Sequence, residues 1–424
     1  MNIVELINKK RNRETLTKDE LKFIVDGYIN GDIKDYQMSS LLMAICINGM
    51  SDEEIYDLTE LMLNSGDRID LSEIDGVKVD KHSTGGVGDK TTLILAPLVA
   101  SCGVCVPKMS GRSLGHTGGT IDKLESINGF KTDLAREDFI KEVNDIKVAI
   151  VSQTGNLVPA DKKIYALRDV SGTVESIPLI ASSIMSKKLA CGANKIVLDV
   201  KVGNGALMKT LEDASKLAET MVKIGKKNDV EVVCVLTDMS QPLGNAIGNS
   251  LEVLESIEVL KGNGPKDLVS LVTKIATIMV SLGKSISFED AEEEVKINLI
   301  NGKAYKKFCD MIEYQHGDIN TIEVSKRVFS IKSPKTGFVS AINAYGLGEV
   351  VRKIGAGRYD KTDSINHGVG VVLNKKVGDY VLQDEEILKV YLGDKDITVG
   401  EILDCFTITG KLDEEIPLIH KIIK

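Results

Sequence analysis

Two glycine-rich segments with hydroxyl side chains lie close together in this chain. The first reads KHSTGGVGDKTTL from Lys81, and the second reads KMSGRSLGHTGGTIDKLE from Lys108. Glycine lets the backbone turn with its N–H groups exposed, and a following helix start adds the positive end of its dipole. Lys81, Lys108 and Arg112 place positive charge nearby in sequence. These features predict an oxyanion site, and phosphate is the expected anion.

The first segment differs from the Walker A loop of nucleoside triphosphatases, GxxxxGK[ST]. In that loop a glycine precedes the lysine, so that the backbone can wrap the β-phosphate. Here Asp89 precedes Lys90, and its carboxylate would repel a polyphosphate. A pair of tight turns would explain the glycines, but not the repeated Lys-His-Ser and Lys-Met-Ser runs. We therefore disfavour a P-loop nucleoside triphosphatase.

A second group of polar residues lies in the segment 158–192. Ser183 and Lys187 are four residues apart, so a helix would place them on one face, and Arg168 precedes them. Two cations and a hydroxyl suit a ring that carries carbonyl oxygens. A solvated helix face explains these residues equally well, because most lysines are exposed and Lys188 is a polar neighbour. The pattern by itself does not choose between Lys187 and Lys188.

Composition limits the class of partner and the compartment. The 424 residues carry a net charge of -9, which argues against nucleic acid or an anionic membrane as a partner. No apolar run approaches the ~20 residues that cross a bilayer, and the start lacks a signal-peptide core. Seven cysteines suit a reducing compartment, so we expect a cytoplasmic protein. We interpret the CxxC run Cys102–Cys105 as two buried thiols rather than a redox pair.

The pattern of apolar residues divides the chain into regions. Residues 1–65 read as helices, with capping boxes at Thr17 and Ser51. Residues 66–335 alternate short apolar strands with amphipathic helices, which indicates an α/β core with a mostly parallel sheet. Within them, 158–192 predict a helix beginning near Pro178 that docks on the amino-terminal helices. Residues 336–424 read as a small β-rich domain.

Four motifs in this chain resemble the thymidine and pyrimidine-nucleoside phosphorylase family. They follow the family order and spacing, and the resemblance extends over essentially the whole chain. The motifs are KHSTGGVGD from Lys81, SGRSLGHTGGTIDKLE from Ser110, VPADKKIYALRDVSGTVESIPLIASSIMSKKLA from Val158, and LDVKVGNGA from Leu198.

The resemblance implies a fold and an activity. The fold is a helical domain (1–65 and 158–192), a large α/β phosphate-binding domain (66–157 and 193–335) and a carboxyl-terminal β-containing (α+β) domain (336–424), usually in a homodimer. The activity is phosphorolysis of pyrimidine nucleosides to free base and pentose 1-phosphate, a reaction of nucleoside salvage. No organic cofactor is implied, and phosphate is the co-substrate. The site is then expected in a cleft that closes about connectors near 65–66, 155–159 and 192–193.

The resemblance also assigns roles to individual residues. The family's base-recognition positions correspond to Arg168, Ser183 and Lys187, with Tyr165 packing beside the base, and this selects Lys187 over Lys188. His82 corresponds to the histidine that hydrogen-bonds or protonates the base, and the sequence leaves both roles open. The phosphate positions correspond to Lys81, His82, Ser83, Thr92, Ser110 and Thr120, with the backbone of Lys108 and Met109.

A potassium site is implied as well. Its ligands would be backbone oxygens of Gly88, Lys90, Leu243 and Ala246 and the carboxylate of Glu255. The family pattern has a smaller residue at position 90, so the ammonium of Lys90 is expected to point away from the ion.

Two further departures concern substrate preference. Ser113 stands where the family signature has a small residue without a hydroxyl, and Leu207 stands where family members often have phenylalanine. We favour a broad enzyme that accepts uridine, thymidine and deoxyuridine. The alternative is a strict thymidine phosphorylase. An anthranilate phosphoribosyltransferase-like enzyme is more remote, because it would need acidic magnesium ligands, and a binding protein without catalysis would not need both half-sites.

Overall fold

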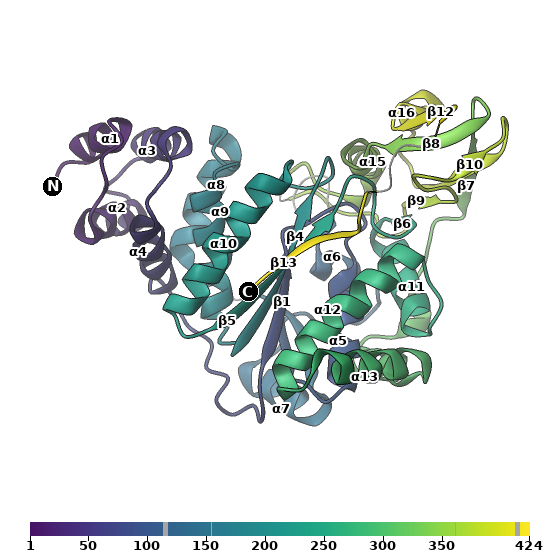
Figure 1. Ribbon diagram of the computed structural model, residues 1–424, viewed down its shortest axis with the longest axis horizontal. Helices are drawn as coiled ribbons and strands as arrows, with labels where there is room; N and C mark the ends of the chain where they lie inside the picture. Colours follow the sequence, from purple (N-terminus) through teal and green to yellow (C-terminus); the bar gives the residue numbers. More distant parts are fainter. Residues whose placement is uncertain (113–117, 154, 361, 412–415) are drawn as a thin grey trace.

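The computed structural model describes residues 1–112, 118–153, 155–360, 362–411 and 416–424, so Ser113 lies outside the described residues. A helical region, an α/β region and a β-rich region follow one another across the molecule (Figure 1). This arrangement confirms the predicted fold class.

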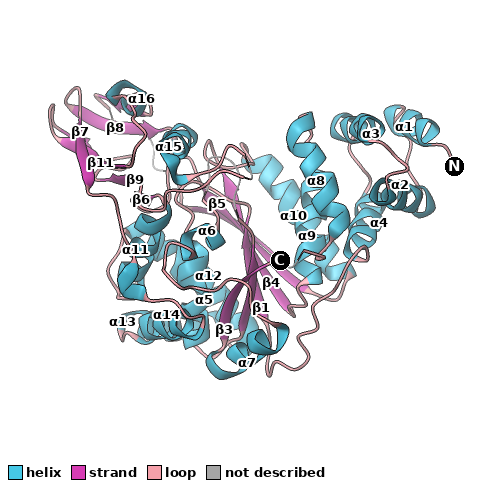
Figure 2. Ribbon diagram, turned by 180° about the vertical axis from the view of Figure 1, so that it is seen from behind, coloured by secondary structure: helices cyan, strands magenta, loops and turns pink. Residues whose placement is uncertain are grey.

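The amino-terminal helices pack with two helices from the middle of the chain. Both predicted capping boxes are present: the side chains of Thr17 and Ser51 each accept the N–H three residues on, and Glu20 and Glu54 reciprocate. One apolar core joins the amino-terminal helices to α8 and to both ends of α9 (Figures 1 and 2). The elements are α1 Ile3–Arg11, α2 Lys18–Asn30, α3 Asp35–Asn48, α4 Asp52–Leu63, α8 Pro159–Ser171 and α9 Ile177–Ala190.

Parallel strands form the centre of the molecule. β1 pairs with β4, β4 pairs with β5, and β2 pairs with β3, all in parallel register. A parallel bridge between Lys78 and Cys105 connects β1 to β2. The carboxyl ends of these strands therefore meet at one edge, where open α/β sheets bind their ligands. The strands are β1 Val79–Ser83, β2 Val106–Ser110, β3 Val148–Ser152, β4 Lys195–Val202 and β5 Glu231–Asp238.

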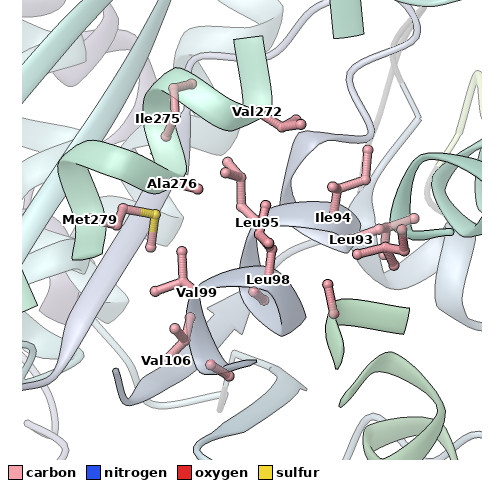
Figure 3. Close-up of a cluster of buried hydrophobic side chains, with 14 of the residues drawn as sticks. Leu93, Ile94, Leu95, Leu98, Val99, Val106, Val272, Ile275, Ala276 and Met279 are labelled. Atoms are coloured by element: carbon pink, nitrogen blue, oxygen red, sulfur yellow. The ribbon is translucent and has the colours of Figure 1, made fainter. Parts of the chain in front are cut away.

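Helix α5 follows the first glycine-rich segment and is buried on every side. Its apolar residues, including Leu95 and Leu98, pack against Val272 and Ile275 of α12 (Figure 3). A helix buried this completely fixes the position of the segment that precedes it. The helices around the sheet are α5 Thr91–Ser101, α6 Thr120–Leu124, α7 Arg136–Ile146, α10 Leu211–Lys227, α11 Asn249–Leu260, α12 Lys266–Lys284, α13 Phe288–Ile300 and α14 Lys303–Tyr314.

The carboxyl-terminal region consists mainly of antiparallel strands. They form sheets of order β10-β8-β12 and β6-β9-β11-β7, in which β6 comes from the α/β region. The elements are β6 Ala246–Ile247, η1 Ile319–Thr321, β7 Arg327–Lys332, β8 Gly337–Ile342, α15 Ala344–Val351, the π-helical turn η2 Arg352–Ala356, β9 Gly370–Leu373, β10 Tyr380–Val381, β11 Glu386–Leu392, α16 Val399–Leu403 and β12 Phe406–Thr409.

The last strand leaves this region. β13, Ile419–Ile423, pairs antiparallel with β5 at the edge of the central sheet (Figure 1). The predicted domain 336–424 places this strand with the β-rich region, whereas its backbone hydrogen bonds place it in the α/β region. β7 also begins before the predicted boundary. The pattern of apolar residues predicts such a strand, but it does not predict which sheet the strand joins.

Within the described residues, no single helix is long and apolar enough to cross a membrane. Only α12 and α13 taken together, which are bent by 119° at their junction, meet the length and composition required. The Cys102–Cys105 run matches its predicted role: both thiols are buried at the α5–β2 junction, and burial raises the pKa of each.

Candidate functional site

Strand β1 separates two polar clusters. Alternate residues of a strand point to opposite faces, so Lys81 and Ser83 face one way, and Asp80 and His82 face the other. Lys81 and Ser83 contact the start of α5 and its loop. Asp80 instead contacts α9 and β2. A single strand thus faces the glycine-rich loop on one side and the interrupting helix on the other.

The phosphate-side cluster is built around Asp89. Its carboxylate accepts hydrogen bonds from the hydroxyls of Ser83 and Thr91, the latter at 2.6 Å. Lys81 donates to the Thr91 hydroxyl at 2.5 Å and lies 3.8 Å from Asp199. Burial raises the pKa of Asp89, but Lys81 and Lys201 together hold it well below its usual range. Asp89, whose position argued against a Walker A loop, therefore stabilises the conformation of this loop by accepting hydrogen bonds from two hydroxyl side chains.

The remaining predicted phosphate residues lie at the same edge of the sheet. Ser110 ends β2, Thr120 begins α6, and Thr92 lies in the first turn of α5. Ser110 and Thr120 are partly exposed, whereas Thr92 is buried. Residues 113–117 between Ser110 and Thr120 lie outside the described part of the chain.

Lys108 and Met109 lie behind this edge rather than in the loop. The Lys108 ammonium binds Asp80 at 3.2 Å, and Met109 packs in the helical core. Lys108 is therefore not a side-chain donor at the sheet edge, contrary to what its place before the second loop suggested. The contact that was predicted for their backbone groups stays a prediction.

The second face of β1 carries a buried triad of charges. Asp80 binds Lys108 at 3.2 Å and Lys188 at 2.7 Å, and all three side chains are at most 2 % exposed. Burial opposes ionisation of Asp80, but the two lysines lower its pKa to about 2. Burial lowers the pKa of Lys108 to about 7: the Asp80 carboxylate raises this pKa, but the nearby charge of Lys188 lowers it as well. The triad joins α9 to β1.

Lys187 and Lys188 have different environments. The Lys188 ammonium is paired with Asp80, whereas the Lys187 side chain is 28 % exposed and its ammonium lies 2.7 Å from Asp161 of α8. It also lies 5.4 Å from the centre of the Tyr165 ring, whose other neighbour is Arg168. The structure thus brings Lys187, Tyr165 and Arg168 together, and it gives Lys188 a structural contact.

Arg168 and Ser183 are more enclosed than Lys187 and Tyr165. Arg168 is fully buried and donates to the carbonyls of Thr173, Val174 and Leu179, which close the loop between α8 and α9. Ser183 is 4 % exposed on α9, one turn before Lys187. Arg168 therefore stabilises the loop in addition to any contact with a ligand.

His82 follows the triad on the same face of β1. Burial lowers its pKa well below the usual range, and the ammonium groups of Lys188 and Lys108 lower it further. The ring is therefore neutral at pH 7, and it can donate one hydrogen bond without carrying a charge.

We expect the His82 imidazole to titrate with a pKa below the usual midpoint near 6.5, because burial and the two lysine charges disfavour the imidazolium. An NMR titration of the histidine ring protons checks this, with the His82→Gln variant identifying the signal. A His82 midpoint at or above 6.5 would show that the two lysines do not act on the ring as described.

The predicted potassium ligands also converge. The carbonyls of Leu243 and Ala246 and the carboxylate of Glu255 surround one point beside Gly88. The ammonium of Lys90 occupies that point, so the expectation that it points away is wrong. These residues consequently do not fit a bound potassium ion. In the described part of the chain, no group of three or more His, Cys, Asp or Glu could hold a metal ion.

Sequence reasoning missed the acidic residues that position the cations. Asp80, Asp89, Asp161 and Asp199 each contact a lysine or a hydroxyl of the site. For Asp199 the available signal was a charged residue within the apolar strand β4, because buried charges need partners. The identity of each partner depends on the tertiary structure.

Comparison with known proteins places the chain in a family. Residues 4–66 match the glycosyl transferase family helical bundle domain, and residues 75–305 match its a/b domain. Residues 338–408 match the pyrimidine nucleoside phosphorylase C-terminal domain. A pyrimidine-nucleoside phosphorylase from Staphylococcus epidermidis is 53 % identical over 432 residues, covering 100 % of both chains. The chain belongs to the pyrimidine-nucleoside phosphorylase family.

Other members of the pyrimidine-nucleoside phosphorylase family are equally close. Proteins of that name from Staphylococcus haemolyticus and Staphylococcus aureus are each 52 % identical, again over the full length of both chains. The solved anthranilate phosphoribosyltransferase from Thermus thermophilus shares the fold, with a TM-score of 0.57 over 73 % of this chain and 98 % of that one. At 17 % identity that likeness concerns the fold alone.

Proposed function

We propose that this protein cleaves the N-glycosidic bond of pyrimidine nucleosides with inorganic phosphate, releasing the free base and pentose 1-phosphate. The observation that supports it most is that β1 has two polar faces. One face contacts the hydroxyl-rich loop before α5, and the other contacts α9, the helix that carries the candidate base-binding residues. This arrangement suits a reaction in which phosphate and base approach one sugar from opposite sides. The full-length similarity to pyrimidine-nucleoside phosphorylases supports the same reaction.

In this proposal the phosphate is held at the edge of the sheet. Lys81, Ser83, Thr92, Ser110 and Thr120 donate to its oxygens, together with the backbone of the two glycine-rich segments. Asp89 holds the loop in shape before phosphate arrives, so that little reorganisation is needed when the anion binds. The phosphate can then attack the anomeric carbon from a fixed position.

The base leaves toward the opposite face. Negative charge develops on the pyrimidine ring as the bond breaks, while the sugar becomes oxocarbenium-like. A cation at the ring oxygens stabilises this transition state more than it stabilises the substrate. Lys187 supplies that charge, Ser183 and Arg168 hydrogen-bond the ring, and Tyr165 packs beside it. Neutral His82 donates a hydrogen bond to the ring, which is the role that its low pKa favours over proton transfer from an imidazolium.

Closure of the cleft is part of the proposal, and the predicted connectors lie together. A side chain at Gly66 would collide with the backbone of Asn156 and with Pro159, and Gly192 lies against Ile69. Connectors gathered at one place can act as a common hinge between the helical and α/β regions. Small-angle scattering should show compaction when phosphate and nucleoside bind, and unchanged scattering would count against closure.

We also propose a cytoplasmic homodimer. The seven free thiols suit a reducing compartment. Helix α3 exposes Tyr36, Met43 and Ile47, which together form an apolar surface that a second copy can cover.

The decisive experiment is phosphate-dependent release of free base from uridine and thymidine, assayed side by side. We expect both to be cleaved at comparable rates, and neither without phosphate. Cleavage of thymidine with uridine inert would identify a strict thymidine phosphorylase. No release from either substrate would contradict the proposed reaction.

A further inference from the structure

The side chain of Lys90 ends in a cage of oxygen atoms. Its ammonium donates to the carbonyls of Leu243 and Ala246, each at 2.9 Å, and to the carboxylate of Glu255 at 2.5 Å. The side chain is fully buried. These contacts use all three N–H groups of the ammonium. A buried lysine is normally costly, so a cage this complete is a specific arrangement.

The same oxygen atoms would suit a bare monovalent cation. Carbonyl and carboxylate oxygens are the ligands that hard cations take in proteins. The Glu255 carboxylate is fixed in place by the backbone N–H groups of Asn245 and Ala246, at 3.0 to 3.2 Å. The cage is therefore preorganised around a single positive charge.

The Lys90 ammonium already binds the oxygens of the cage, and the backbone around them is closely packed. A Cβ atom at Gly244 would lie 3.0 Å from the Lys90 ammonium and 2.4 Å from the Glu255 carboxylate, and one at Gly88 would lie 2.6 Å from the Leu243 carbonyl. An ion placed among these oxygens would also meet the lysine charge at contact distance. Coulomb repulsion between like charges at such a separation is unfavourable by several kcal/mol even at an effective dielectric constant of ~20.

The cage is connected directly to the phosphate-side cluster. Lys90 is the residue that precedes α5, and it follows Asp89, which binds Ser83 and Thr91. Its ammonium is anchored 153 to 165 residues away in sequence, at the loop before β6 and at α11. Filling the cage therefore fixes the end of the loop that is proposed to bind phosphate.

We propose that the Lys90 ammonium is a built-in replacement for a monovalent cation, and that this protein needs no potassium for stability or for phosphate binding. A tethered cation loses little entropy on binding and cannot dissociate. The inference concerns the cage itself, and it rests on the proposed function only where phosphate kinetics are used as the readout.

The test compares potassium chloride with tetramethylammonium chloride at equal ionic strength, because tetramethylammonium is too large for the cage. Thermal unfolding of the unaltered protein should be the same in both salts. Lys90→Thr should melt several degrees lower in tetramethylammonium, and potassium should restore the melting temperature. Lys90→Met is the matched control, since its side chain fills the space without charge: it should melt lower in both salts and not respond to potassium.

The KM for phosphate gives a second readout. In tetramethylammonium, Lys90→Thr should show a KM for phosphate raised by about tenfold or more, and potassium should reverse the change. A potassium-dependent melting temperature or phosphate KM in the unaltered protein would overturn the proposal, as would a Lys90→Thr variant that melts like the unaltered protein without potassium. If Lys90→Thr fails to fold, the unaltered protein still decides the question. If the protein shows the predicted unfolding pattern but does not cleave nucleosides, the proposed function is contradicted and the inference about Lys90 still holds.

Discussion

Replacing Lys187 with Ala is expected to lower kcat for phosphorolysis by roughly 10²- to 10³-fold, the usual effect of removing one donor to a developing negative charge. Lys187 is the partly exposed ammonium beside Tyr165, whereas neighbouring Lys188 is bound to Asp80. The lost interaction forms as the base becomes anionic, so kcat should fall more than KM rises. Steady-state kinetics with uridine and thymidine measure the change.

The control for Lys187 must separate catalysis from folding. Its partner Asp161 is fully buried, so Lys187→Ala leaves a buried carboxylate without its ammonium and destabilises the fold. Adding Asp161→Asn removes that charge and should recover much of the melting temperature without recovering kcat. Lys162→Ala, an exposed change on the same helix α8, should leave both unchanged. Turnover that returns in the double variant would show that Lys187 only neutralises Asp161.

Replacing Asp80 with Asn is expected to lower the free energy of unfolding by about 3 to 5 kcal/mol, as is typical when one partner of a buried ion pair is removed. Asparagine has a similar volume, so the loss comes from charge rather than from a cavity. Lys108 and Lys188 would then lie in the core without their common carboxylate. Chemical denaturation monitored by circular dichroism measures the difference.

The pH dependence gives the Asp80 prediction a second readout. The pKa of Asp80 is about 2 in the folded protein, below the usual value of 3.8 for an aspartate. A lowered carboxyl pKa stabilises the fold above the unfolded value, and this contribution is lost as pH falls from about 4 toward 2. Asp80→Asn should lack that part of the acid sensitivity. Asp310→Asn, in an exposed pair with Lys306, should cost at most about 0.5 kcal/mol. Equal effects from both variants would contradict the role of the triad.

The sequence was sufficient wherever a feature depends on neighbouring residues. Capping boxes at Thr17 and Ser51, the helix that begins near Pro178, and the glycine-rich loop before α5 are all local, because hydrogen bonds and backbone angles over a few residues specify them. The alternating order of strands and helices likewise predicted the α/β core. The family resemblance added residue roles that periodicity could not supply, such as the choice of Lys187 over Lys188.

Only the tertiary structure decided where the charges go. Lys188 meets Asp80 across 108 residues, and Lys90 meets Glu255 across 165. A lysine side chain is flexible, and burial forces it toward whatever acceptors the packed elements bring near, so its direction cannot be inferred from its neighbours in the chain. The same reason explains why the sequence did not show that β13 pairs with β5. By itself the sequence determined which elements form and which residues are candidates for the chemistry, and long-range packing determined which charges meet.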